Sequence, residues 1–298
     1  TVVAALAALQ AVGSGWQVAI MAPTELLSQQ HLRNISAWVE PLGYRVAWLS
    51  GRHKGSERRA ILEDIGRGDV QLVVGTHALF QQEVQFAQLG LVIIDEQHRF
   101  GVHQRLQLRE KGARDGSIPH QLIMTATPIP RSLAMTIYSD LDLSVIDELP
   151  PGRTPIQTLA VPDSRRDQVL ERVRHACLGV RQAYWVCTLV EESEALQAQA
   201  AEDTADALRE NLPELRIGLV HGRLKPDARE PVMRAFADGE LDLLVATTVI
   251  EVGVDVPNAS LMVIENPERL GLAQQHQLRG RVGREHVVSC CLLLYRHP

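Results

Sequence analysis

The chain has 298 residues, enough for two sizeable domains, and this length excludes a mini-protein that needs disulfides or metals to fold. Hydrophobic residues make up 45% and charged residues 22%, as in soluble globular proteins, and no apolar run reaches the roughly 18 residues of a membrane span. The net charge of −6 means that any nucleic-acid surface must be a local basic patch. The N-terminal residues lack a basic region and a cleavage signal, so we do not expect a secretory leader.

The four cysteines show neither CxxC spacing nor a histidine-rich neighbourhood. They are Cys177, Cys187, Cys290 and Cys291. This pattern favours reduced thiols in a core over a disulfide framework or a zinc site. We therefore expect a cytoplasmic protein without a membrane partner.

Short runs rich in Val, Ile and Leu alternate with longer stretches of helical period. This alternation is typical of buried parallel strands joined by crossover helices, so we predict an α/β fold. In the first half, strands are predicted over residues 18–21, 46–49, 70–74, 91–95 and 121–124. In the second half, strands are predicted over residues 156–161, 184–189, 216–220, 242–246, 261–264 and 287–295.

One helix is predicted directly after Thr24. Leu32, Ile35 and Val39 are spaced three and four apart and form a single apolar stripe. A proline and a glycine follow and end the helix. We expect this stripe to cover the sheet of the first half.

The periodicity lapses at residues 149–153 (Leu-Pro-Pro-Gly-Arg), which can continue neither a helix nor a central strand. We place the domain boundary there, with a first domain over residues 1–150 and a second over residues 151–298. Both halves contain a strand that ends in threonine, at Thr76 and at Thr247. The shared pattern indicates two similar α/β units in tandem.

Residues 91–96 (Leu-Val-Ile-Ile-Asp-Glu) form an apolar strand that delivers two adjacent carboxylates at its carboxyl end, where α/β sheets bind ligands. Asp95 can hold Mg²⁺, and Glu96 can polarise the water that attacks the γ-phosphate of ATP. A strand that ends in a solvated acidic turn would show the same residues. The surrounding motifs decide between these interpretations.

Several segments resemble motifs of the superfamily 2 helicases, and they occur in family order. Asp95-Glu96-x-His98 resembles motif II, and residues 125–127 (Thr-Ala-Thr) resemble motif III. The other matching segments are residues 22–26 (motif Ia), 75–77 (motif Ib), 246–257 (motif V) and 277–284 (motif VI). One motif could arise by chance, but the ordered set identifies the chain as a member of the superfamily 2 helicases.

The resemblance implies two tandem RecA-like domains, the first without its P-loop strand. The Gly-rich loop ending in Gly-Lys-Thr, which cradles the phosphates of ATP, is absent from the 298 residues. Thr1 resembles the last residue of that loop and would then offer its hydroxyl to Mg²⁺; the alternative is a threonine that merely starts a helix. We expect the missing strand to lie beside the Asp95 strand, so that its absence leaves backbone groups unpaired and the first domain unstable alone. The chain as given is expected to hydrolyse little or no ATP.

The resemblance also implies a role for each matching residue. Asp95 and Glu96 would act with Arg281 and Arg284, whose guanidinium groups reach the γ-phosphate across the cleft between the domains. Residues expected near ATP, or in coupling hydrolysis to DNA, are Thr1, Gln277, Gly253, Asp255, His98, Thr125 and Thr127. Residues expected to contact DNA phosphates are Pro23, Thr24, Glu25, Gly75, Thr76, His77, His221, Gly222, Thr247 and Thr248.

Within the superfamily, residues 95–105, 147–153, 221–225 and 257–260 resemble the bacterial helicases that act on branched DNA. Gln97 favours that family over the translocases of transcription-repair coupling, which usually have an acidic residue there. The resemblance implies a monomeric motor in the bacterial cytoplasm that uses ATP and Mg²⁺ to remodel forks and Holliday junctions during recombination and repair, through closure of the cleft between its domains. Two alternatives remain: a DNA-binding chain without catalysis, and a translocase of transcription-repair coupling.

Overall fold

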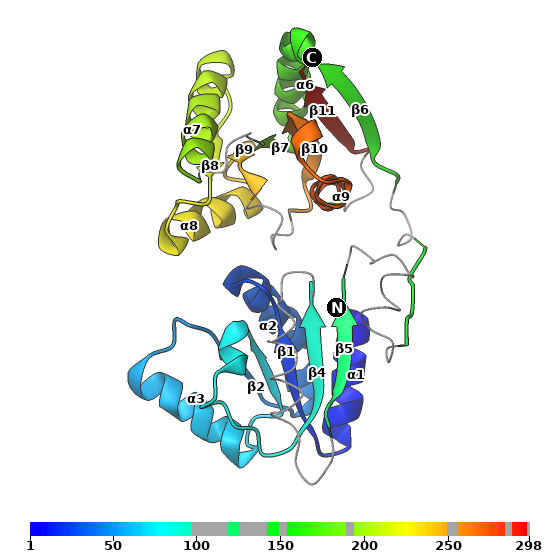
Figure 1. Cartoon of the computed structure of the whole chain (residues 1–298), viewed down its shortest axis with the longest axis vertical. Helices are drawn as coiled ribbons and strands as arrows, with labels where there is room; N and C mark the ends of the chain where they lie inside the picture. The colour runs from blue at the N-terminus through cyan, green and yellow to red at the C-terminus, as the bar shows by residue number, and fades with distance from the viewer. Residues whose placement is uncertain are drawn as a thin grey trace. The chain divides into compact units, whose positions relative to one another are not determined.

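The computed structural model describes residues 1–96, 118–125, 142–148, 154–188, 194–248, 256–283 and 288–296. The chain divides into two compact units, residues 1–128 and 129–298, and each is built on one parallel sheet (Figure 1). The prediction of an α/β fold with two parallel sheets in tandem is therefore confirmed. The predicted boundary between residues 150 and 151 lies outside the described residues and stays a prediction.

The first unit is a five-stranded sheet with the order β2-β3-β1-β4-β5. Val18 and Ile20 face α1 and α2, whereas Ala19 and Met21 face α3, because successive side chains of a strand point to opposite faces. Burial on both faces explains why these strands are continuous runs of Val, Ile and Leu. The elements are α1 (Val2–Gly13), β1 (Gln17–Met21), α2 (Glu25–Val39), η1 (Glu40–Leu42), β2 (Val46–Leu49), α3 (Gly55–Arg67), β3 (Leu72–Gly75), η2 (His77–Phe80), β4 (Leu89–Asp95) and β5 (His120–Met124).

The structure corrects the prediction that the missing strand lies beside the Asp95 strand. β4, which carries Asp95, pairs with β1 on one side and with β5 on the other, so both of its edges are occupied. Within the described residues, the free edge on this side of the sheet belongs to β5. Chain order does not determine which strands pair, because crossover connections skip positions in a parallel sheet.

The second unit is a six-stranded sheet with the order β6-β11-β10-β7-β9-β8. α6 and α7 pack against one face, whereas Phe236 of α8 packs edge-on against Tyr184 on the other face, with ring centroids 4.9 Å apart. None of the helices in the described ranges combines the length and apolar content of a membrane span. The elements are β6 (Gln157–Pro162), η4 (Asp163–Arg165), α6 (Arg166–Leu178), β7 (Gln182–Cys187), α7 (Glu194–Asn211), β8 (Ile217–Val220), α8 (Pro226–Ala237), β9 (Leu243–Ala246), β10 (Ala259–Glu265), η6 (Pro267–Arg269), α9 (Leu272–Arg279) and β11 (Cys290–Tyr295).

The two units share one order of strands and crossover helices, to which the second unit adds η6 and α9 between β10 and β11 within the described residues. The run from α1 to β5 corresponds to the run from α6 to β11, with the sheet positions β2, β3, β1, β4 and β5 matched by β8, β9, β7, β10 and β11 (Figure 1). β6 has no counterpart among the described strands of the first unit, and it lies beside β11, the counterpart of β5. The predicted repetition of similar units is confirmed.

All four cysteines are free and buried, as predicted. Burial raises the pKa of Cys177 and of Cys291 to about 12, and it also raises the pKa of Cys187. Because the thiolate is the reactive form, these thiols should react much more slowly in the folded chain than an exposed cysteine does. We expect a chromogenic disulfide reagent at pH 8 to modify them within seconds after unfolding in urea but not in the native chain. Equally fast modification of the native chain would show that the thiols are accessible.

Val180 is an exposed β-branched residue in the left-handed region, with φ 65°. Its N–H donates to the Cys177 carbonyl at 3.1 Å, and its carbonyl accepts from Asn258 Nδ2 at 2.8 Å, which holds the turn in place. This conformation costs a residue with a Cβ roughly 1–2 kcal/mol. We expect Val180→Gly to raise the free energy of unfolding by about 1 kcal/mol in urea denaturation. Val180→Ala keeps the Cβ and is the control, with less than half of that gain.

Candidate nucleotide and nucleic-acid sites

The carboxyl ends of the strands in the first unit bring the predicted residues to one edge of the sheet. The register pairs Met21 with both Gly75 and Ile94, and it pairs Asp95 with Met124. The strands between which these pairs form are adjacent in the sheet. The segments that follow them therefore stand in a row along that edge: residues 76–77, 22–25, 95–96 and 125.

Asp95 and Glu96 stand where the backbone turns out of β4. Glu96 has φ 51°, an uncommon conformation for a glutamate, and its N–H donates to Asp95 Oδ1 at 3.0 Å. The second oxygen, Asp95 Oδ2, lies 2.7 Å from Nε2 of His31 on α2. Because an ionised carboxylate only accepts hydrogen bonds, Nε2–H of His31 is the donor. The Asp95 side chain, 19% exposed, is thus held in one orientation at the strand end.

This geometry fits a magnesium ion held by few protein oxygens. Mg²⁺ in nucleotide sites usually takes one or two protein ligands and completes its shell with phosphates and water. Over the described ranges, no three His, Cys, Asp or Glu side chains cluster so that they could hold a metal by themselves. Each Asp95 oxygen accepts one hydrogen bond and keeps lone-pair capacity for a cation.

Thr1, the second predicted magnesium ligand, is the N-cap residue of α1. Its side chain is exposed and makes no capping hydrogen bond, so the helix does not use the hydroxyl. α1 ends at Gly13, just before β1 begins at Gln17, and a crossover helix runs antiparallel to the strand that follows it. Thr1 therefore lies toward the carboxyl edge of the sheet, the edge that carries Asp95 (Figure 1).

The predicted DNA contacts of the first unit lie at two strand ends and differ in exposure. Thr24 is the N-cap of α2, where its hydroxyl accepts from Leu27 N at 3.3 Å. Glu25, which begins the helix, pairs with Arg52 at 2.5 Å. After β3, Thr76 is only 2% exposed, whereas His77 is exposed. The Thr76 hydroxyl is therefore shielded from solvent, and a phosphate could meet only its backbone or its neighbours.

In the second unit, His221 and Gly222 follow β8, and Thr247 and Thr248 follow the neighbouring strand β9. His221 and Thr247 are 6% and 4% exposed, while Gly222 is exposed and Thr248 is half-buried. His221 Nε2 lies 3.3 Å from a carboxylate oxygen of Glu202 on α7. The structure brings these four predicted residues together, with Gly222 and Thr248 as the more accessible pair.

The segment that resembles motif VI is anchored by α9. Leu278 is fully buried, whereas Gln277 and Arg281 are half-buried. Gly283 has φ 77°, and a Cβ at this position would lie 2.9 Å from Ile156 Cγ1, so both the backbone conformation and the close approach require glycine. The buried leucine and the glycine turn fix the backbone that carries Gln277 and Arg281.

The other predicted residues are divided between the described and undescribed parts of the chain. Thr125 is exposed and directly follows β5, the neighbour of the Asp95 strand. Five predicted residues lie outside the described ranges and their roles stay predictions: Arg284, Gly253, Asp255, His98 and Thr127.

Sequence reasoning missed a loop of the first unit that corresponds to His221-Gly222. Residues 50–54 (Ser-Gly-Arg-His-Lys) follow β2 as residues 221–225 (His-Gly-Arg-Leu-Lys) follow β8, and β2 and β8 occupy matching sheet positions. In both loops the lysine is the N-cap of the next helix. The pattern Gly-Arg-x-Lys, repeated in the two halves, is the sequence signal that finds this loop.

The second unit also has a counterpart of Asp95. Glu265 ends β10 as Asp95 ends β4, and Asn266, like the residue after Asp95, has a left-handed conformation, with φ 46°. Arg166 Nη1 lies 2.5 Å from Glu265 Oε1. Arg166 begins α6, the counterpart of α1, which Thr1 precedes. Where the first unit has the carboxylate and the hydroxyl that are predicted to bind magnesium, the second unit has a carboxylate that is paired with a guanidinium.

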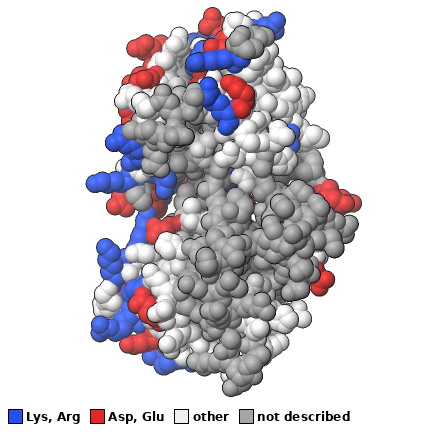
Figure 2. Space-filling model, in the orientation of Figure 1, with Lys and Arg blue, Asp and Glu red and all other residues white. Residues whose placement is uncertain are grey.

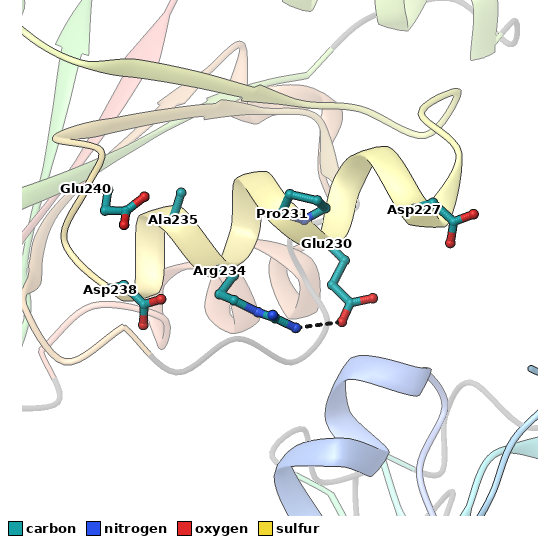
Figure 3. Close-up of a pocket in the computed structure, with 7 residues that line it drawn as sticks. All are labelled: Asp227, Glu230, Pro231, Arg234, Ala235, Asp238 and Glu240. Atoms are coloured by element: carbon teal, nitrogen blue, oxygen red, sulfur yellow. Dashed lines mark hydrogen bonds and ion pairs between the residues drawn. The ribbon is translucent and has the colours of Figure 1, made fainter.

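A pocket of about 330 Å³ lies along α8 (Figure 3). Its charged lining consists of Asp227, Glu230, Asp238, Glu240 and Arg234, and Arg234 pairs with Glu230 at 3.1 Å. Four carboxylates against one guanidinium repel phosphates, so this pocket suits neither ATP nor DNA. On the described part of the face in Figure 2, Lys and Arg side chains are interspersed with Asp and Glu, which agrees with the near balance of charges in the sequence.

Comparisons with known proteins assign both units. Residues 1–136 match the DEAD/DEAH box helicase family, and residues 166–286 match the helicase conserved C-terminal domain. The chain belongs to the superfamily 2 helicases. Over its whole length this helicase chain is 68% identical to ATP-dependent DNA helicase RecG of Escherichia coli O157:H7 and 66% identical to that of Pasteurella multocida, and it spans 43% of the length of each. The predicted resemblance to a branched-DNA helicase is confirmed as a resemblance to RecG.

Solved structures of helicases support the fold. A structure of RecG bound to a three-way DNA junction is 44% identical, with a TM-score of 0.81 over the whole of this helicase chain and 38% of that one. Helicase Lhr of Mycobacterium smegmatis, bound to ssDNA and AMP-PNP, is 20% identical with a TM-score of 0.71, covering 98% of this chain and 42% of that one, and shows the fold alone. The prediction of two RecA-like helicase domains is confirmed.

Proposed function

We propose that this chain supplies the ATP-driven motor of a bacterial helicase that remodels branched DNA in recombination and repair. The observation that carries the proposal is the Asp95–Glu96 pair at the end of β4, where two hydrogen bonds orient the Asp95 carboxylate. The 68% identity to RecG and the similarity to RecG on a three-way junction support branched DNA as the substrate. We further propose that the protein works as a monomer in the cytoplasm.

ATP hydrolysis is proposed to divide its tasks among residues of the two units. Glu96 orients the attacking water and accepts its proton, while Asp95 and Thr1 would hold Mg²⁺, which supplies charge neutralisation of the phosphates when bound. Arg281 and Arg284 stabilise the charge that develops on the γ-phosphate. Residues proposed to line the nucleotide site are Gln277, Gly253 and Asp255.

DNA is proposed to bind along the strand ends without being read for sequence. The segments after β1, β3, β8 and β9 present backbone N–H groups and small polar side chains, which are suited to phosphates. Because Thr76 and His221 are buried, we assign their contacts to the backbone. The Thr247 N–H already donates to Val220 O, so we assign the contact after β9 mainly to Thr248. His98, Thr125 and Thr127 would couple the nucleotide site to this surface.

We propose that hydrolysis requires the full-length protein. The 298 residues contain no Gly-Lys-Thr loop, and such loops supply the N–H groups and the lysine that bind the phosphates of ATP. The chain by itself is then expected to bind DNA without hydrolysing ATP, with an affinity that falls as salt rises.

Phosphate release from Mg·ATP by the full-length protein tests the proposal. We expect a three-way junction to stimulate release more strongly than a linear duplex of equal length, and we expect no release above background from the 298-residue chain. Equal stimulation by the linear duplex would contradict the branched substrate. Release by the 298-residue chain would contradict our interpretation of Thr1.

A further inference from the structure

The strongest unassigned feature is a buried histidine beside the Asp95 carboxylate. His31 lies in the second turn of α2 and is 3% exposed, and its Nε2 is 2.7 Å from Asp95 Oδ2. The contact joins a helix that carries predicted DNA contacts to a carboxylate of the predicted nucleotide site.

Core packing does not account for this imidazole. The buried face of α2 continues with Ile35 and Val39, so an aliphatic side chain at position 31 would complete the apolar stripe. A polar side chain buried there is costly unless it is hydrogen-bonded. His31 Nδ1 is buried and has no hydrogen-bond partner in the described part of the chain, so the bond to Asp95 is the polar interaction that compensates.

α2 is fixed at its first turn and reaches Asp95 with its second. Thr24 caps the helix, Glu25 pairs with Arg52, and Ser28 accepts a hydrogen bond from Trp48 Nε1 at 2.9 Å. Thr24 and His31 are seven residues apart, which is about 10 Å along a helix. A displacement of the helix start by DNA would therefore be carried by the same rigid element to His31.

We infer that His31 is a positioning residue, which holds the Asp95 carboxylate in the orientation that Mg·ATP requires and links it to the DNA segment at the start of α2. This inference rests on the proposed function for the role of Asp95. Residues that hydrogen-bond a metal ligand typically change metal affinity or activity by about 10–100-fold when they are removed.

Two substitutions in the full-length protein separate positioning from packing. His31→Gln keeps an N–H donor at a similar reach to Nε2, whereas His31→Leu keeps the bulk and removes the donor. We expect His31→Leu to raise the Mg²⁺ concentration for half-maximal DNA-stimulated hydrolysis by about 10-fold or more, and His31→Gln to stay within about 3-fold of the parent. Mn²⁺ binding in the presence of ADP, followed by the electron paramagnetic resonance of free Mn²⁺, should weaken in the same order without any turnover.

Further readouts make the test decisive. DNA affinity without nucleotide should be unchanged in both variants, because His31 is too buried to meet DNA, whereas stimulation of hydrolysis by DNA should fall only in His31→Leu.

Thermal melting identifies a variant that fails to fold. In that case His31→Leu is replaced by His31→Asn, whose shorter amide does not reach Asp95. Parent-like Mn²⁺ affinity in the donor-less variant, or equal losses in the Gln and donor-less variants, would overturn the inference. A parent protein that hydrolyses no ATP would instead refute the proposed function, and the Mn²⁺ comparison would still decide the role of His31.

Discussion

Glu96→Gln in the full-length protein is expected to lower DNA-stimulated phosphate release by about 10²–10⁴-fold while ATP binding persists. The amide has nearly the same shape but cannot accept the proton of the attacking water. The N–H of residue 96 and the His31 imidazole still hold Asp95 in the variant, so the proposed magnesium ligand should not be disturbed. Steady-state phosphate release at saturating ATP and junction DNA measures the loss, and binding of a fluorescent ATP analogue measures the retained affinity.

Two further variants control this experiment. Glu210→Gln makes the same chemical change at an exposed position of α7, and its rate should lie within about 2-fold of the parent. Asp95→Asn should differ from Glu96→Gln because it weakens a magnesium ligand and therefore lowers nucleotide affinity as well. If Glu96→Gln retained more than a tenth of the parent rate, another group would have to receive the proton.

The strands were predictable because most of them are covered on both faces of a parallel sheet and therefore have few polar positions. All eleven predicted strands are present, with ends within three residues of the expected ones. The order of the strands was not predictable from hydrophobicity, which says where a strand runs but not which edge it pairs with. That is why the Asp95 strand was expected at an open edge and is instead enclosed by β1 and β5.

The site was predictable in part, because motif spacing locates strand ends but not the polar groups buried behind them. The apolar stripe of α2 correctly indicated the buried face through Ile35 and Val39, yet it passed over Ser28 and His31, which are buried on the same face. An apolar pattern cannot reveal a buried polar side chain whose hydrogen-bond partner lies far away in the sequence. Burial of Thr76, a predicted DNA contact, is likewise decided by packing that no motif encodes.

Gln17→Leu is expected to lower the free energy of unfolding of the first unit by about 2–4 kcal/mol. Gln17 is buried at the start of β1, where its Nε2 donates to Ile65 O at 3.0 Å and Val70 O at 2.7 Å, and its Oε1 accepts from Gln88 N at 3.0 Å. Ile65 O also accepts from Gly68 N, so the loss falls mainly on Val70 O and Gln88 N. Leucine fits the apolar surroundings but leaves Val70 O, on a buried residue, without its partner, at a cost of about 1–3 kcal/mol. It also removes the partner of the Gln88 N–H, which lies on an exposed residue, at a smaller cost of about 0.5–1.5 kcal/mol.

The second unit provides an internal repeat of the same experiment. Gln182 opens β7, the counterpart of β1, and its Nε2 donates to Phe236 O at 2.6 Å and Leu241 O at 2.7 Å. Phe236 O also accepts a second N–H, from Gly239, as Ile65 O does from Gly68. Gln182→Leu therefore removes the partner of one carbonyl, Leu241 O, rather than of two groups. We expect the free energy of unfolding to fall by about 1–3 kcal/mol, in the second unit alone.

Hydrogen exchange along a urea gradient distinguishes the two units by following peptides that contain β1 and β7. Gln199→Leu is the matched control, since Gln199 is exposed and, within the described part of the chain, its amide donates to Asp203 on its own helix; its effect should stay within about 0.5 kcal/mol. The Gln17 and Gln182 variants share no partner, so their effects should add when combined. A loss no larger than that of Gln199→Leu would mean that the crossover loops relax to satisfy their own carbonyls. The glutamine that begins both β1 and β7 would then be left over from duplication of the unit. Its hydrogen bonds would not be what fixes each central strand to the end of its crossover helix.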